Sequence, residues 1–167
     1  MNRIPDLIFT APSSAEHREE LDLYAPLIGS WDIESIWYSQ DGTRRQGRGE
    51  WHFAWILGGY GVQDVLFACD APSHHYGTSV RCYDITQDLW HITWMQPYGG
   101  EFVHLTGHRI GERIVQEGAG TDPRRRERWS FADVTSNSFT WLGEVSFDDG
   151  LTWSLEQEMH GTRRVDA

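Results

Sequence analysis

Hydrophobic and polar residues alternate with a period of two along most of the chain, beginning after Gly29. The alternating runs are rich in Trp, Val, Ile, Phe and Thr, and turn sequences containing Gly, Pro, Asp or Asn separate them. This pattern is typical of β-strands that bury one face. It predicts ten strands, near residues 30–39, 44–57, 60–69, 78–84, 89–95, 101–109, 113–117, 124–134, 139–147 and 151–163.

Short connections join most of these strands, so consecutive strands are expected to pair antiparallel. A meander of ten strands has to close on itself or leave two long edges exposed. We therefore expect an all-β fold, an antiparallel up-and-down barrel. One end, which we take as the mouth because it holds the longest loops, would carry the turns 40–43, 70–77, 96–100, 118–123 and 148–150. The 70–77 loop is expected to be mobile and to gate this end when a ligand binds.

The region before the first strand predicts an arm and one helix. Residues 1–12 show no periodicity and contain two prolines, which favours an extended arm. Ser13 and Glu16 have the spacing of a capping box, a helix over 15–24 follows, and Pro26 ends it. The helix would close the floor of the barrel, and residues 13–167 would form a single domain.

Two short motifs resemble a known superfamily. Gly29-Ser30-Trp31 opens the first strand after the helix, and Arg163 and Arg164 close the last strand. This arrangement resembles the calycins, the lipocalins and their relatives, in which the Arg lies across the Trp and seals the barrel floor. Longer stretches are similar to a bacterial family of lipocalin-like barrels of the nitrobindin and fatty-acid-binding type: 49–67, 83–94 and 128–164. The resemblance implies the fold but no single chemistry, since calycins include carriers, haem proteins and enzymes.

Strand alternation also predicts which side chains face the interior. On the first strands Trp31 is expected inside, with the Trp51 face of the second strand and Asp64 on the third; a bulge would instead turn His52 inward. On the fifth and sixth strands the expected inner face is Trp90, Ile92, Trp94, Phe102, His104, Thr106 and His108. On the last three strands it is Trp129, Phe131, Leu142, Glu144, Trp153, Leu155, Gln157 and Met159.

A ten-stranded barrel is too wide for side chains alone to fill, so we expect a cavity for a small, mostly apolar or aromatic molecule. The side chains expected to bind it are Trp51, Phe53, Trp55, Trp90, Trp94, Trp129, Trp153, Gln157, Tyr76 and Tyr98. Within this set, a carboxylate against indole rings has its charged form desolvated, which raises the carboxylate pKa and suits it to acid–base work.

Three residues are the catalytic candidates: Glu144, Asp64 and His104. Together they suggest a cofactor-free enzyme, an isomerase, cyclase, decarboxylase or lyase. The alternative for each carboxylate is a structural role, hydrogen-bonded to Gln157, a Tyr or an Arg. At the level of the whole protein, the alternatives are a non-catalytic carrier or sensor, and a haem- or nitric-oxide-binding barrel. In haem barrels of this type the resemblance places a His on the last strand, where His160 is expected to point outward.

Charge and composition narrow the choice further. The chain has 167 residues and a formal net charge of −11, from 14 basic and 25 acidic side chains. Such a charge repels nucleic-acid phosphates and anionic membrane surfaces, so neither is an expected partner. All the basic residues are Arg, which excludes Schiff-base chemistry, lysine-bound pyridoxal phosphate and the nucleotide P-loop. The Arg run 124–126 is expected to be solvated, or else to guide an anionic ligand to the mouth.

No cofactor or metal is expected. His104 and His108 share a strand face but would lie about 13 Å apart, too far for one ion. The sequence has no apolar run long enough for a membrane helix and no signal-peptide pattern at its start. Its two cysteines, Cys69 and Cys82, are typical of reduced thiols. We therefore expect a cytoplasmic monomer or homodimer whose partner is a small molecule.

Overall fold

Ten antiparallel strands form a closed barrel in the computed structural model, which describes residues 8–12, 19–69 and 76–165. The strands are β1 (Gly29–Tyr38), β2 (Arg44–Ile56), β3 (Gly61–Ala68), β4 (Tyr76–Asp84), β5 (Leu89–Gln96), β6 (Glu101–Ile110), β7 (Arg113–Ala119), β8 (Arg126–Ala132), β9 (Ser138–Ser146) and β10 (Ser154–Arg163). Each strand pairs with its sequence neighbours, and β1 pairs with β10 to close the barrel. The predicted up-and-down barrel is confirmed.

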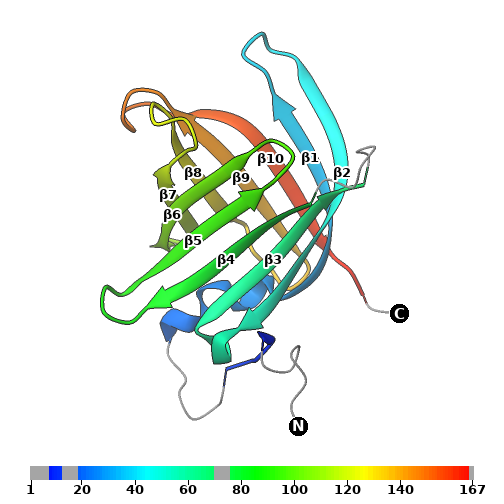
Figure 1. Cartoon of the computed structure of the whole chain (residues 1–167). Helices are drawn as coiled ribbons and strands as arrows, with labels where there is room; N and C mark the ends of the chain where they lie inside the picture. The colour runs from blue at the N-terminus through cyan, green and yellow to red at the C-terminus, as the bar shows by residue number, and fades with distance from the viewer. Residues whose placement is uncertain (1–7, 13–18, 70–75, 166–167) are drawn as a thin grey trace.

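The barrel has two unlike ends (Figure 1). The β1–β2, β5–β6, β7–β8 and β9–β10 turns lie together at one end, at the top of Figure 1. The helical segment η2 (Glu19–Leu27) lies at the other end, which is the floor. Most of the 70–77 loop falls outside the described residues. Within the described part of the chain, no helix is long and apolar enough to cross a lipid bilayer.

The floor segment is a 3-10 helix, which corrects the helix predicted over 15–24. It covers Glu19–Leu27 and continues through Pro26; the proposed capping residues Ser13 and Glu16 lie outside the described residues. Its buried residues Leu21, Tyr24 and Leu27 are spaced by three. A 3-10 helix has three residues per turn, so this spacing puts all three side chains on one face, toward the barrel. Tertiary burial thus selects the tighter helix.

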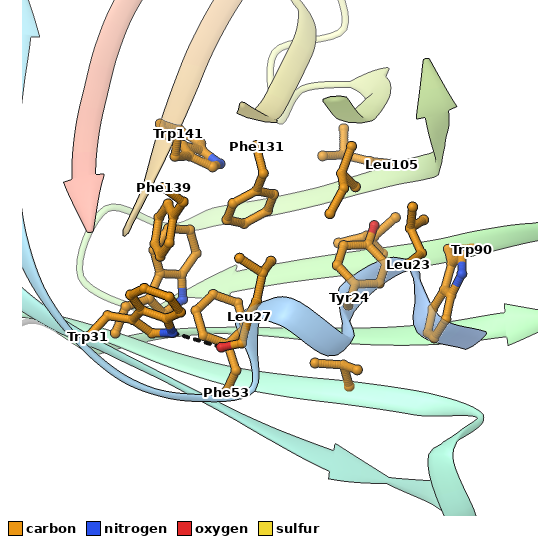
Figure 2. Close-up of a cluster of buried hydrophobic side chains, with 14 of the residues drawn as sticks. Leu23, Tyr24, Leu27, Trp31, Phe53, Trp90, Leu105, Phe131, Phe139 and Trp141 are labelled. Atoms are coloured by element: carbon orange, nitrogen blue, oxygen red, sulfur yellow. Dashed lines mark hydrogen bonds between the residues drawn. The ribbon is translucent and has the colours of Figure 1, made fainter. Parts of the chain in front are cut away.

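Large side chains fill the lower half of the barrel above this helix (Figure 2). Tyr24 meets Trp90 edge-on, with ring centroids 4.9 Å apart. The indole N–H of Trp90 donates to the Glu20 carbonyl at 3.1 Å, and that of Trp31 donates to the Leu27 carbonyl at 2.7 Å. These bonds satisfy both indole N–H groups and attach the helix to strands β1 and β5 of the barrel wall. Residues 8–12 reach the same end, where the Gly58 amide donates to Thr10 Oγ1 at 2.6 Å.

Strand register confirms the predicted inward faces of β1, β2, β3 and β5. Trp51 pairs with Leu66 and Phe53 with Asp64, so these four side chains share the inner face. Along β5, Trp90 and Ile92 are almost completely buried.

The sixth strand is turned the other way from the prediction. Trp94 pairs with Val103 and Ile92 with Leu105, because four residues separate β5 from β6. Val103 and Leu105 therefore face inward, and His104 lies on the outer face. The outer Thr93 hydroxyl contacts His104 Nδ1 at 3.1 Å. The predicted inward orientation of Phe102, His104, Thr106 and His108 is wrong.

The ninth strand and the start of the tenth are also reversed. Phe131 pairs with Trp141, so the inner face of β9 is Phe139, Trp141, Gly143 and Val145, and the predicted inward Leu142 and Glu144 lie outside. The β8–β9 register already places Glu144 on the outer face, and a bulge between Leu155 and Gln157 places its partner Leu155 there as well. An extra residue in one strand reverses every side chain beyond it. The predicted inward orientation of Leu155 and Trp153 is therefore wrong as well.

Candidate functional site

Two connected hollows occupy the upper half of the barrel. The first, which we call the mouth cavity, has a volume of about 400 Å³. It is lined by Trp37, Glu101, Val103, Thr121, Asp122, Arg125, Glu127, Trp129, Trp141, Gly143, Val145, Glu156 and Gln157. The second, the inner chamber, has a volume of about 90 Å³. It is lined by Trp51, Leu66, Ser79, Arg81, Trp94, Glu101, Trp129, Trp141, Gln157 and Met159. Glu101, Trp129, Trp141 and Gln157 line both, so the two hollows adjoin.

Four tryptophans form a continuous aromatic wall around the inner chamber. Trp94 and Trp129 are nearly perpendicular, with an interplanar angle of 88° and centroids 6.2 Å apart. Trp129 lies 5.8 Å from Trp141, and Trp141 lies 6.3 Å from Trp51. Such perpendicular and tilted arrangements place ring edges against ring faces, the geometry that the aromatic quadrupole favours. The chamber is therefore suited to a flat apolar group.

Two glycines on the inner face make room for these indoles. A Cβ atom at Gly77 would overlap the ring of Trp94, and one at Gly143 would lie 2.6 Å from Trp141 Cη2. Any larger residue would push the indole away from the wall. Gly77 and Gly143 therefore set how close to the strands the rings lie, and hence the width of the chamber.

The indole N–H groups of the aromatic wall differ in whether they have a hydrogen-bond acceptor. Trp94 Nε1 donates to Glu101 Oε2 at 3.2 Å, and Trp129 Nε1 donates to Glu127 Oε2 at 3.3 Å. Trp51 Nε1 is buried and has no hydrogen-bond partner among the described residues. A buried N–H without an acceptor costs about 1–3 kcal/mol. Trp51, a lining residue of the inner chamber, thus carries a buried donor that no described protein group satisfies.

An ion-pair cluster lies in the mouth cavity. The Arg125 guanidinium bonds both Glu127 and Glu156, with Nη2 2.6 Å from Glu156 Oε2. Burial alone would lower the pKa of Arg125, but its hydrogen bonds to these two carboxylates raise it. Glu156 is the extra residue of the β10 bulge, so it departs from the strict alternation of the strand and joins this cluster.

A second polar network lies below the inner chamber. Arg81 forms a buried salt bridge with Asp64, and its Nε donates to Gln116 Oε1 at 3.2 Å. Asp64 Oδ1 also accepts the Ser79 amide at 3.0 Å, and Gln116 Oε1 accepts the Tyr24 hydroxyl at 3.2 Å. Burial raises the pKa of Tyr24 well above its usual value. The network joins the floor helix to three strands of the wall.

The three predicted catalytic residues do not meet. Glu144 lies on the outer face, where it makes a two-bond salt bridge to Arg128 at 2.9 Å. His104 lies on the outer face of β6. Asp64 does face inward, but Arg81 neutralises it. The predicted inward placement of Glu144 and His104 is wrong, for the register reasons given above, while that of Asp64 is confirmed.

The predicted ligand-binding residues divide into three groups. Trp51, Trp94, Trp129 and Gln157 line the inner chamber. Phe53, Trp55 and Trp90 belong to the hydrophobic core or pack against it. Tyr76 and Tyr98 are about half exposed near the mouth, and Trp153 lies outside the cavity, 4.2 Å beneath the Arg128 guanidinium. The expected contact between Trp153 and a ligand inside the barrel is therefore wrong.

Several residues of the site were missed at the sequence level. They are Trp37, Glu101, Trp141, Arg81, Gln116, Arg125, Glu127 and Glu156. Trp141 could have been found, because it alternates with Phe139 and Val145 on the more apolar face of its strand. Arg81 could not, because its facing depends on the register across the 70–77 loop.

The described residues offer little to haem or to a metal ion. His52, His91, His104, His108 and His160 do not line the cavity, and His160 is exposed beside Glu158, outward as predicted. No group of three or more His, Cys, Asp or Glu in the described ranges could hold a metal ion.

Comparison with known proteins supports the fold. No protein-family model and no curated protein matches the chain. Among solved structures, Rv2717c from M. tuberculosis is similar, with a TM-score of 0.61 and 12% identity over 90% of this chain and 100% of its own. The S-type phycobiliprotein lyase CPES from Guillardia theta has a TM-score of 0.63 and 6% identity over 87% of this chain and 93% of its own. At this level of identity, the likenesses extend to the fold alone, a closed antiparallel barrel.

Proposed function

We propose that the barrel binds a small, mostly apolar or aromatic organic molecule that carries a hydrogen-bond acceptor. The observation that carries this proposal is the buried N–H of Trp51, which has no partner among the described residues and belongs to a side chain that lines a chamber walled by indoles. A flat group between the rings buries apolar surface, and a carbonyl or similar oxygen of the ligand would accept the Trp51 proton. Ligand pockets commonly combine apolar walls with a few such polar groups.

Binding without turnover is the role we favour. Proton transfer at a substrate needs acid and base groups within hydrogen-bond reach of it. Glu144 and His104 lie outside the barrel, and the Asp64 carboxylate is held by Arg81 and the Ser79 amide. A carrier or sensor needs none of these groups.

A cofactor-free enzyme is the second candidate, because Glu127 provides one specific feature. Like Asp64 it is paired with an arginine, Arg125, but unlike Asp64 it lines the mouth cavity, next to Trp129, where a proton could pass to a bound molecule. A barrel of similar fold is a phycobiliprotein lyase, so this architecture is compatible with a lyase. Acid–base catalysis by Asp64 stays a prediction.

Matched aromatic ligands test the binding proposal. Acetophenone and 2-acetylnaphthalene, each beside a hydrocarbon of the same shape, would be titrated while tryptophan fluorescence is recorded. We expect the ketones to bind more tightly than the hydrocarbons. Trp51→Phe keeps a ring but removes the N–H, and should weaken ketone binding about 2- to 10-fold, the value of one buried hydrogen bond. Trp153→Phe, outside the cavity, is the control.

The outcomes separate clearly. If neither ketone nor hydrocarbon binds, the proposal fails. If Trp51→Phe and Trp153→Phe have equal effects, the Trp51 N–H is not the anchor. Turnover of any bound ligand that Glu127→Gln abolishes would favour the enzyme instead.

A further inference from the structure

Carboxylates outnumber guanidinium groups around the mouth cavity. Its lining includes four acidic residues, Glu101, Asp122, Glu127 and Glu156, but one basic residue, Arg125. The formal sum is 1 − 4 = −3. Arg124 lies outside this lining and its side chain is 83% exposed, but it pairs with Asp122 at 2.8 Å. If Asp122 is left out as neutralised by Arg124, the formal sum is still 1 − 3 = −2.

The neighbouring arginines do not reverse this charge. Arg126 pairs with Asp149 and Arg128 with Glu144, both away from the cavity lining. The hypothesis that the Arg run guides an anionic ligand is therefore not favoured. An anion entering the mouth would meet three carboxylates and a guanidinium that already bonds two of them.

Aromatic side chains also line the acidic mouth cavity. Trp37, Trp129 and Trp141 line the mouth cavity, and Trp94 and Trp129 direct their N–H groups at Glu101 and Glu127. An indole that donates its N–H to a carboxylate has a more electron-rich ring, and Trp is the best ring for attracting a cation. Aromatic walls and acidic groups together are the usual surroundings of bound ammonium groups.

The unpaired donor is a separate sign that this cavity holds a ligand. Trp51 is 3% exposed, its buried N–H has no partner among the described residues, and it lines the inner chamber, which shares Glu101, Trp129 and Trp141 with the mouth cavity. A molecule that spans both hollows would place its flat body and a hydrogen-bond acceptor in the inner chamber. Its other end would lie among the carboxylates of the mouth cavity.

We propose that the ligand of this barrel is an aromatic ammonium compound, with its cationic group in the mouth cavity between the indoles and Glu101, Glu127 and Glu156. This inference rests on the proposed binding function and adds the ligand class. It concerns an organic cation, since the tryptophans offer ring faces to the positive group and no set of three acidic, His or Cys side chains in the described ranges could hold a metal ion.

Three ligands of matched shape test the charge preference. Benzyltrimethylammonium is positive, neopentylbenzene is its neutral isostere, and phenylmethanesulfonate is negative. We expect the cation to bind about tenfold more tightly than the neutral isostere, and the anion to bind most weakly. Raising the salt concentration should weaken binding of the cation and leave the neutral compound unaffected. Isothermal titration calorimetry on the full chain gives all of these affinities.

Two variants and a matched control locate the effect. Glu101→Gln removes the charge but keeps an oxygen that can accept the Trp94 N–H, so folding should be unaffected. This variant should reduce the preference for the cation over its neutral isostere about threefold or more. Glu156→Gln should act in the same direction. Glu144→Gln removes an equally charged carboxylate from the outer face and should leave the preference unchanged.

The possible failures are distinguishable. Equal affinity for the cation and its isostere, with the ketones still binding, would overturn the ammonium inference and leave the binding function intact. Preferential binding of the anion would also overturn it. If these three compounds and the ketones all fail to bind, the proposed function itself is wrong.

Discussion

The guanidinium carbon of Arg163 lies 4.0 Å from the centroid of the Trp31 ring, at the point where the last strand pairs with the first. Arg163 Nη1 and Nη2 donate to the carbonyls of Ile28 and Pro26, each at 2.7 Å. One side chain thus joins the seam of the barrel to the end of the floor helix. The contact expected from the resemblance to calycins is present, and it seals the end opposite the mouth.

Trp31→Ala should destabilise the fold strongly. The indole is fully buried and supports both Arg163 and Phe139, so its removal should lower the free energy of unfolding by about 3–5 kcal/mol. Urea unfolding followed by circular dichroism measures this change. Trp153→Ala is the control: it removes a similar stack with Arg128 from the outer face, and about 1 kcal/mol is expected. Equal losses for the two variants would show that the Trp31 contact does not support the closure.

The buried pair of Asp64 and Arg81 provides a second prediction. Asp64→Asn would leave the Arg81 charge buried without its counter-ion, and about 3–5 kcal/mol of stability should be lost. Asp149→Asn breaks an exposed ion pair with Arg126, and less than about 1 kcal/mol is expected. The double variant Asp64→Leu, Arg81→Met should recover most of the loss, because no charge then remains buried. A double variant no more stable than Asp64→Asn would contradict this account.

Strand alternation predicts the barrel well because one face of nearly every strand is buried, and burial imposes a period of two. The strand ends are less accurate where side chains cap the turns. The last strand was expected from 151 but begins at Ser154, because the Asp148 carboxylate accepts hydrogen bonds from the Thr152 amide and hydroxyl and holds the preceding residues in a turn.

The candidate site was predicted only in part, since its composition depends on strand facing. The tryptophans of the first five strands were placed correctly, because a short turn such as that between β2 and β3 leaves the parity readable. Beyond the β5–β6 and β8–β9 turns, a shift of one residue exchanged the two faces and put Glu144 and His104 outside. The bulge near Glu156 has no local sequence signal, since it is a feature of the pairing between β10 and β9.

The β9–β10 turn should respond to acid. Hydrogen bonds from Thr152 and Ser146 lower the pKa of Asp148 from its usual 3.8 to about 2. A carboxyl whose pKa is lower in the folded state stabilises that state above its unfolded pKa and stops doing so as pH falls through the folded value. The melting temperature should therefore fall between about pH 4 and pH 2, and it should fall less in Asp148→Asn. The same acid dependence in both proteins would rule out this turn as a source.

The spacing of the chamber wall can be tested at Gly77, whose missing side chain leaves room for the ring of Trp94. Gly77→Ala should displace that indole, lower stability by about 1–3 kcal/mol as in other overpacked cores, and narrow the inner chamber. Trp94→Phe presents a smaller ring, so Gly77→Ala should cost less in that background than in the natural protein. Urea unfolding of the two single variants and the double variant gives the coupling energy, expected to be at least about 1 kcal/mol. If the two changes add within about 0.5 kcal/mol, Gly77 does not position Trp94, and the width of the chamber must be set by other contacts.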